Sequence, residues 1–241
     1  CSQNPRKILK MANQRRSLDT PPFRNNITTL KAKNIKRLYM MPLGDLIVAI
    51  TMTVFLIVGV YQFYFLTQNH MIKPAKQFDM KVDKLFKFKG YWVWLYSGLY
   101  YPMIVATVLT IENMRQYNYS FMSFVFLLFI QMAFFRYYPV ETPASWRDFS
   151  DLKQTRSVRF MQFVQKYDDN TNCFPSMHVS VATLVAFHVW NNVPEVGNWP
   201  FLFPVIIALS ALWTKQHYVV DVVAGIIPGW IAWELYKLIQ Y

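Results

Sequence analysis

Long apolar runs separated by short polar segments organise this chain. The first run, Leu46–Leu66, has 21 residues and no charged side chain, which is enough for a helix to cross a bilayer. The later apolar runs are Tyr91–Ile111, Tyr119–Tyr138, Met177–Trp190, Trp199–Trp213 and Val219–Leu238. The fourth and fifth are short, so each needs polar extensions or burial among other helices. We predict an all-α fold, an integral-membrane bundle of six transmembrane helices that begins near residue 44.

The polar segments divide the rest of the chain. Residues 1–43 carry ten Lys or Arg and one acid, which predicts a basic, mostly disordered tail. Residues 72–90 alternate lysines with apolar side chains, as in an amphipathic helix at the membrane interface, although a solvated loop is the alternative. Residues 139–175 are polar and contain Pro139 and Pro143, so we expect a loop.

Composition supports the same class of protein. Hydrophobic residues make up 54% of the 241 residues and charged residues 16%, as in membrane proteins. The net charge of +12 comes from basic residues that flank apolar runs, so we expect contact with anionic lipid surfaces and no nucleic acid partner. Two cysteines do not predict a disulfide framework.

Two segments carry the candidate chemistry. Asn172–His178 places Pro175 and Ser176 before an apolar run, as at a helix start, where backbone N–H groups attract anions. Thr214–Asp221 places His217 and Asp221 four residues apart, on one face of a helix. A histidine paired with a carboxylate, a second histidine and an anion-binding helix end favour phosphoryl transfer. The structural alternative is a polar pair that ties two helices together.

The same segments resemble a known family. Pro175-Ser-Met-His178 and His217-x-x-x-Asp221 resemble the second and third signature motifs of the type 2 phosphatidic acid phosphatase superfamily. Within that superfamily, the motif sequences are most similar to those of the inositol-phosphorylceramide-synthase-like branch. The resemblance implies a metal-independent membrane enzyme without a cofactor, a phosphatase or phosphotransferase acting on a lipid phosphate. It also implies that His217 is the nucleophile, that Asp221 supports it, and that His178 is the acid and then the base.

The phosphate-binding residues depart from the family pattern. The first motif, Lys, six residues and Arg-Pro, is not found, and the segment from Arg136 to Arg147 resembles instead the Phe-Pro-x-x-x-Pro form of the synthase-like branch. Arg147 is the leading candidate in this region. Ser210-Ala211 stands where the third motif has Ser-Arg, so Lys215 is the candidate substitute, and Ser176 is a further candidate ligand or a helix cap. The weaker arginine candidates are Arg136, Arg156 and Arg159.

Topology supports a common site. With six spans, the region of Arg136–Arg147, the start of the fourth span and the turn before the last span all lie on the same membrane face. Basic residues are nearly balanced between the two faces, so the positive-inside rule does not orient the protein. The family resemblance places the site on the extracytoplasmic face.

Other functions are compatible with part of the pattern. The resemblance allows a phospholipid headgroup transferase of the inositol-phosphorylceramide-synthase type. Two histidines and an aspartate are enough ligands for zinc, although no tight pair such as His-Glu-x-x-His is present. Asp221 and Glu234 within the last apolar run also fit a transporter that relays protons. That reading explains neither the Pro-Ser-Met-His motif nor the shared membrane face.

Overall fold

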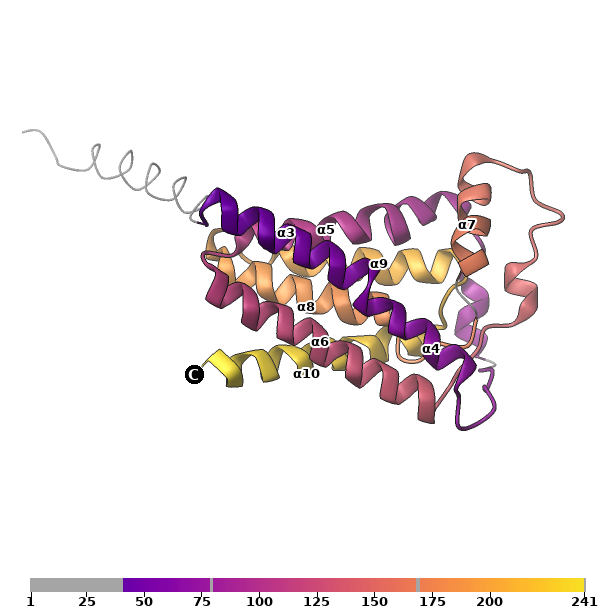
Figure 1. Ribbon diagram of the computed structural model, residues 1–241. Helices are drawn as coiled ribbons and strands as arrows, with labels where there is room; N and C mark the ends of the chain where they lie inside the picture. Colours follow the sequence, from indigo (N-terminus) through magenta and orange to yellow (C-terminus); the bar gives the residue numbers. More distant parts are fainter. Residues whose placement is uncertain (1–40, 79, 168–169, 241) are drawn as a thin grey trace, which may run out of the picture. The chain divides into compact units, whose positions relative to one another are not determined.

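The apolar runs form helices that pack side by side, as shown by the computed structural model (Figure 1), which describes residues 41–78, 80–167 and 170–240. Residues 1–40, most of the predicted basic tail, lie outside this description. Residues 41–241 form one compact unit. The α-helices of this unit are α3 (Leu43–Val58), α4 (Phe63–Asn69), α5 (Tyr100–Thr107), α6 (Met114–Tyr137), α7 (Arg156–Tyr167), α8 (Met177–Asn192), α9 (Leu202–Trp213) and α10 (Val219–Gln240).

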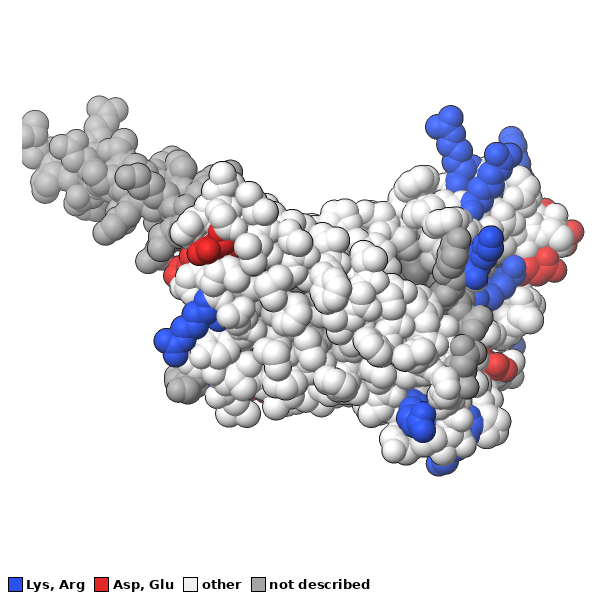
Figure 2. Space-filling view, viewed as in Figure 1, with Lys and Arg blue, Asp and Glu red and all other residues white. Residues whose placement is uncertain are grey.

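The surface of the unit fits a membrane protein. Within the described residues, four helical segments are long and apolar enough to cross a bilayer: Leu43–Gln68, Gly90–Thr110, Met114–Tyr137 and Val219–Gln240. Charged side chains gather at two ends of the unit, and the surface between them is almost free of charge (Figure 2). The predicted all-α membrane bundle is therefore confirmed.

The two short apolar runs have different surroundings. Helix α8 has ten buried residues out of sixteen and packs against α5, α6, α9 and α10. Because α8 is buried among other helices, most of its side chains contact protein. It therefore does not need a long apolar surface to face the lipid. Trp199–Trp213, which includes α9, is a shorter apolar helical segment. That α8 and α9 also cross the membrane stays a prediction.

The first apolar run is interrupted. Helix α3 ends at Val58, a 3₁₀ turn covers Val60–Gln62, and α4 begins at Phe63. The break occurs at Gly59, where a Cβ would lie only 2.8 Å from the carbonyl oxygen of Phe55. Glycine therefore allows the helix to change direction near the end of the bundle that carries the motifs.

The expectation of an interfacial helix over residues 72–90 is wrong for the described part of this segment. Its helical residues are those of the short 3₁₀ helix Lys81–Leu85 and Gly90, the first residue of the next 3₁₀ helix, Gly90–Trp92. Phe78 packs on Phe174, and Phe86 packs on Trp213. The apolar side chains of this segment therefore contact different parts of the protein and do not form one face of a helix. Asp83 is buried in the middle of the segment.

The expected loop over residues 139–175 contains an amphipathic helix, α7. Val158 and Met161 of α7 are buried with Val93 and Phe149, whereas its arginines are exposed. The loop prediction was therefore incomplete. The apolar face of α7 covers the end of the bundle where the motifs meet.

Candidate active site

The three motif segments meet at one end of the bundle. Val140, Cys173 and Tyr218, one from each segment, are buried in the same small apolar cluster. The Cys173 N–H donates to the Val140 carbonyl at 3.0 Å, and the Tyr218 hydroxyl donates to the Glu141 carbonyl at 3.0 Å. The structure thus brings together segments separated by as many as 77 residues of sequence.

A tight turn between α9 and α10 presents His217. The N–H of Gln216 donates to the Ala211 carbonyl and that of Lys215 to the Leu212 carbonyl, which is the pattern of a Schellman motif. Lys215 occupies the left-handed position of this motif, with φ of 58°, where glycine is more usual. The turn ends the helix at a fixed point and starts α10 two residues after His217.

His217 is held by one of its two ring nitrogens. Its Nδ1 lies 2.9 Å from the Cys173 carbonyl oxygen and 3.5 Å from Oδ2 of Asp221. A carbonyl oxygen only accepts hydrogen bonds, so Nδ1 carries the proton and Nε2 has the lone pair. This is the tautomer in which Nε2 can act as a nucleophile.

Asp221 is fully buried at the start of α10. Its Oδ2 accepts the N–H of Tyr218 at 2.8 Å, and its backbone carbonyl accepts the N–H of Ser176 at 3.0 Å. Its Oδ1 has no hydrogen-bond partner among the described residues. The carboxylate therefore sits beside the imidazole and caps the start of α10, whereas the backbone carbonyl of the same residue links α10 to the residue that caps α8.

His178 lies in the first turn of α8. Ser176 caps this helix by accepting the N–H of Val179 at 3.5 Å. Nδ1 of His178 lies 3.0 Å from the Tyr96 hydroxyl, and its ring packs on Tyr96 and Tyr100 with centroid separations of 4.1 and 4.6 Å. Tyr96 belongs to a π-helical turn, Trp94–Leu99, a distortion that is frequent at functional sites.

Close packing of α8 on α10 sets the separation of the two histidines. A Cβ on Gly225 would lie 2.7 Å from the Ser176 carbonyl oxygen, and one on Gly229 would lie 2.4 Å from that of Ser180. The Ser180 hydroxyl donates to the Gly225 carbonyl at 2.6 Å. The two glycines, four residues apart, allow backbone contact as in other membrane helix pairs. The ring centroids of His178 and His217 are 6.3 Å apart.

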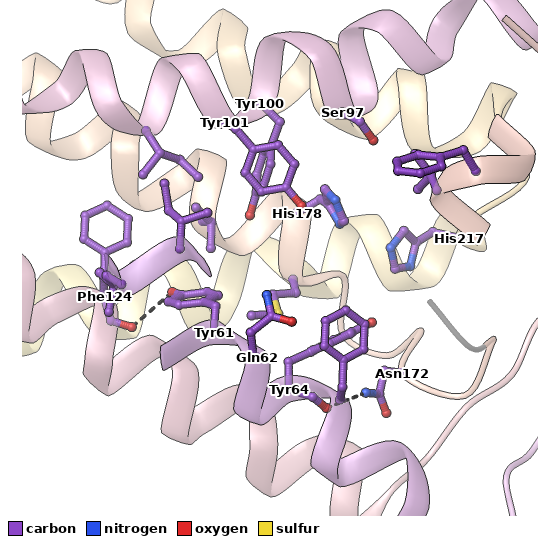
Figure 3. A pocket seen from close by; sticks show the side chains of 18 of the residues that line it. Tyr61, Gln62, Tyr64, Ser97, Tyr100, Tyr101, Phe124, Asn172, His178 and His217 are labelled. Carbon is purple, nitrogen blue, oxygen red and sulfur yellow. Dashed lines mark hydrogen bonds between the residues drawn. The ribbon is translucent and has the colours of Figure 1, made fainter. Parts of the chain in front are cut away.

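Both histidines line a cavity of about 320 Å³ (Figure 3). We call it the catalytic cavity. Tyr61 and Gln62 lie on one side of it and Tyr100 and Tyr101 on the other. The lining is mostly apolar and aromatic, and three side chains of the α7 segment contribute to it: Phe160, Phe163 and Val164.

None of the described lysines and arginines lines this cavity, and this includes the predicted phosphate-binding cations. The Lys215 ammonium donates to the Asp83 carbonyl at 2.8 Å and lies 4.3 Å from the centre of the Trp146 ring. Burial lowers the pKa of Lys215, and the charge of Asp83 opposes this shift. Because Lys215 makes these contacts and does not line the cavity, its role as a phosphate ligand stays a prediction.

The arginine candidates are farther from the histidines. Arg136 donates to the His70 carbonyl at 2.9 Å and so ties the end of α6 to the end of α4. Arg147 lines a separate hollow beside α7. Arg156 and Arg159 are exposed on α7. Ser176 is fully buried as the cap of α8, so its direct contact with a phosphate also stays a prediction.

Sequence reasoning missed several residues around the histidines. Tyr96 and Tyr100 stand in an aromatic-rich run in which no local pattern distinguishes them. Asp83 accepts the N–H of Val219 at 2.7 Å and so caps α10 from 136 residues away. The sequence indicated this role only weakly, because Asp83 is one acid in a segment rich in lysines. Asn172, within the motif segment, donates to the Tyr64 carbonyl at 3.1 Å and anchors α4.

A metal ion is the alternative occupant for three residues of the motif segments. The possible ligand atoms of Cys173, His217 and Asp221 all lie within 4.8 Å of one another. However, the Cys173 thiol donates to the Asn170 carbonyl at 3.0 Å, and His217 Nδ1 donates to the Cys173 carbonyl. Metal ligands must be deprotonated at the ligating atom. The hydrogen bonds therefore favour a neutral imidazole over a metal ligand.

Comparison with known proteins gives one finding. A family model described as the PAP2 superfamily matches residues 82–235, more than half of the chain. The match includes Asp83 and both histidine motifs. Searches of curated proteins and of solved structures found no match.

Proposed function

The chain belongs to the PAP2 superfamily, and from this premise we propose that it is a lipid phosphatase or phosphotransferase that works through a phosphohistidine on His217. Membership supports an enzyme that acts on phosphoric esters. The observation that carries the finer proposal is the arrangement of His217: its Nδ1 is bound to the Cys173 carbonyl beside Asp221, which leaves Nε2 for the cavity.

In the first step Nε2 of His217 attacks the phosphorus of the ester. The bond from phosphorus to the lipid oxygen breaks, and His178 donates a proton to that oxygen as it leaves. Asp221, 3.5 Å from Nδ1 of His217, stabilises the positive charge that develops on the imidazole. The 6.3 Å between the ring centroids leaves room for a phosphoryl group between the two histidines.

In the second step the acceptor takes the phosphoryl group. His178, now without its proton, removes one from water or from an alcohol, whose oxygen attacks phosphorus and releases His217. Water gives a phosphatase and an alcohol gives a headgroup transferase of the inositol-phosphorylceramide-synthase type. Both products come from the same covalent intermediate. The free N–H end of α8 adds a positive dipole next to the phosphoryl group.

The site belongs, by our proposal, on the extracytoplasmic face. Together with Arg136 at the end of α6, the connections that surround the site hold thirteen of the fifteen Lys and Arg residues that follow residue 43, and the other ten of the chain precede α3. The two groups nearly balance, so charge does not set the orientation, and the family resemblance supports it instead. Labelling of single cysteines at positions 150 and 112 in intact cells tests this, because only position 150 should react with an impermeant reagent.

A phosphate-release screen tests the function. The purified full chain is given phosphate esters of diacylglycerol, of a polyprenol and of a sphingoid base, with and without an alcohol acceptor, in the presence of a chelator. We expect phosphate release or phosphoryl transfer that persists in chelator and is inhibited by vanadate. Activity that disappears in chelator and returns with zinc would favour the metal site instead.

A further inference from the structure

The hydroxyl of Ser97 is a buried polar group of the catalytic cavity that the proposed mechanism does not use. Ser97 lines this cavity together with His178 and His217 and is only 8% exposed. Its oxygen points toward the two histidines from the side of the cavity on which Tyr101 also lies (Figure 3). No hydrogen bond joins this oxygen to another described residue. The cavity therefore contains a hydroxyl group that is available to a bound molecule.

The local backbone explains why this hydroxyl has no partner in the protein. Buried serine and threonine side chains of helices often donate to the carbonyl four residues earlier. In this chain the residues that do so include Thr53, Thr107, Ser180, Thr183 and Thr214. Ser97 lies in the π-helical turn Trp94–Leu99, in which backbone N–H groups bond to the carbonyl five residues earlier. The wider turn changes the alignment of Ser97 with the Val93 carbonyl, and the hydroxyl faces the cavity instead.

The same turn contacts the acid–base histidine. The hydroxyl of Tyr96, the preceding residue, lies 3.0 Å from Nδ1 of His178, and the two rings stack with centroids 4.1 Å apart. Consecutive Cα atoms are about 3.8 Å apart. Ser97 therefore lies beside this contact, at the part of the cavity where a phosphoryl group would pass between His217 and the oxygen that His178 protonates.

A phosphoryl group in this cavity needs hydrogen-bond donors. Its oxygens carry negative charge, and a buried anion without hydrogen bonds is strongly destabilised. None of the described lysines and arginines lines the cavity. The Tyr61 hydroxyl donates to the Phe124 carbonyl, so its proton is already used. The Asn172 amide likewise donates to the Tyr64 carbonyl. The hydroxyl of Ser97 has no such bond and is free to donate.

We propose that Ser97 binds the substrate phosphate, with its hydroxyl donating a hydrogen bond to a non-bridging oxygen of the transferred phosphoryl group. This inference rests on the proposed function and adds to its site a neutral donor that belongs to neither histidine motif. A hydroxyl also accepts hydrogen bonds, so the attacking water or alcohol is the alternative partner. The phosphate is favoured because it brings several charged oxygens, whereas the attacking hydroxyl already gives its proton to His178.

Ser97→Ala tests the proposal because it removes the hydroxyl with little change in volume. We expect kcat/KM to fall about 10-fold to 100-fold with a lipid phosphate and by the same factor with p-nitrophenyl phosphate, since both contain the phosphoryl group. The Ki of vanadate, an analogue of that group, should rise by a similar factor. Ser120→Ala is the matched control, because Ser120 is also buried in a helix and does not line the cavity. The control should match wild type in all three measurements.

Single-turnover labelling separates the phosphate from the attacking group. If Ser97 binds the phosphate, labelled enzyme should form more slowly from a ³²P-labelled phosphate ester in Ser97→Ala than in wild type. A normal rate of labelling followed by slow release of the label would show that the hydroxyl positions the attacking group, and would overturn the proposal. An unchanged Ki of vanadate would overturn it too. So would a loss of activity that follows a lower midpoint of thermal unfolding, since Ser97 would then act through the fold.

Binding of ³²P-labelled inorganic phosphate, measured by equilibrium dialysis, distinguishes this inference from the proposed function. If wild type binds phosphate more tightly than Ser97→Ala but cleaves no phosphate ester, the proposed function fails and the phosphate site stands. If wild type cleaves phosphate esters and Ser97→Ala binds phosphate and turns over as wild type does, the role of Ser97 fails and the function stands. Wild type that neither binds phosphate nor cleaves an ester would contradict both.

Discussion

The Tyr96 hydroxyl lies 3.0 Å from Nδ1 of His178, and the two rings stack with centroids 4.1 Å apart. The imidazolium that acts as the acid carries a proton on both ring nitrogens, so Nδ1–H donates to the Tyr96 oxygen and Nε2–H is available to the leaving alkoxide. After that transfer Nδ1 keeps its proton through the bond to Tyr96, and Nε2 has the lone pair that the second, basic step requires. Tyr96 acts through His178 and is a positioning residue.

Tyr96→Phe tests this relationship because it removes the hydroxyl and keeps the ring. We expect turnover of an alkyl phosphate to fall by about 10-fold to 100-fold, within the range that general acid catalysis contributes. Turnover of p-nitrophenyl phosphate should fall much less, since its leaving group needs no proton. Tyr100→Phe is the control, because its ring also contacts His178. An equal effect on both substrates, or the same effect from Tyr100→Phe, would show a merely structural role.

Gly229→Ala tests the contact that holds the two histidines together. The added Cβ would meet the Ser180 carbonyl oxygen at 2.4 Å, so α8 and α10 must separate. Overpacking of this kind costs about 1–3 kcal/mol of stability. We expect a lower midpoint of thermal unfolding in detergent together with reduced turnover. Gly44→Ala is the matched control, because nothing lies within 4 Å of its Cβ position. Wild-type behaviour of Gly229→Ala would contradict the close packing.

Lys215 gives a prediction on pH dependence. Burial lowers its pKa, so the ammonium loses its proton at a lower pH than an ordinary lysine does. If Lys215 binds the phosphate, KM should rise as the pH increases toward the alkaline range. Lys215→Arg should postpone this rise, and Lys215→Ala should raise KM about tenfold at neutral pH, in line with a lost charge-assisted hydrogen bond.

The control for Lys215 is Lys89, which lies 4.9 Å from the centre of the Trp213 ring in a comparable cation–π contact. Lys89→Ala should leave KM unchanged. An unchanged KM in Lys215→Ala would remove this residue from the phosphate site and leave the arginines as the candidates.

Asp221→Asn separates two roles of the carboxylate. The Cys173 carbonyl is nearer to Nδ1 of His217 than Asp221 is, at 2.9 Å against 3.5 Å, so the tautomer survives the substitution. The variant loses only the electrostatic stabilisation of the imidazolium. We expect kcat to fall about 10-fold to 100-fold with little change in KM, as for other groups that act in the transition state. A larger loss with unfolding would instead mean that the carboxylate mainly stabilises the start of α10 through the N–H of Tyr218.

The sequence predicted the helices and the histidine motifs because both signals are local. A long uncharged run has one stable form in a bilayer, and His217 and Asp221 are four residues apart. The break at Gly59 was not predicted, since glycine is common in membrane helices and the apolar run continues through it. Helix α7 was not predicted because its apolar side chains are buried by Val93 and Phe149, which are distant in sequence.

The surroundings of the site could not be read from local patterns. Asp83 contacts the Lys215 ammonium through its backbone carbonyl, which any residue would offer, at a separation of 132 residues. The choice of Tyr96 among many neighbouring aromatics depends on the π-helical turn that directs it to His178. These are tertiary relationships, and the chemistry they support follows from geometry and not from spacing.

Trapping of the covalent intermediate tests the central claim most directly. The enzyme is mixed with a ³²P-labelled phosphate ester, quenched in alkali and analysed for protein-bound label that is stable in base and lost in acid. We predict such label on His217 in wild type and in His70→Ala, and none in His217→Ala. His178→Ala should accumulate label from p-nitrophenyl phosphate, because the second step lacks its base. Turnover and labelling at wild-type levels in His217→Ala would contradict the account.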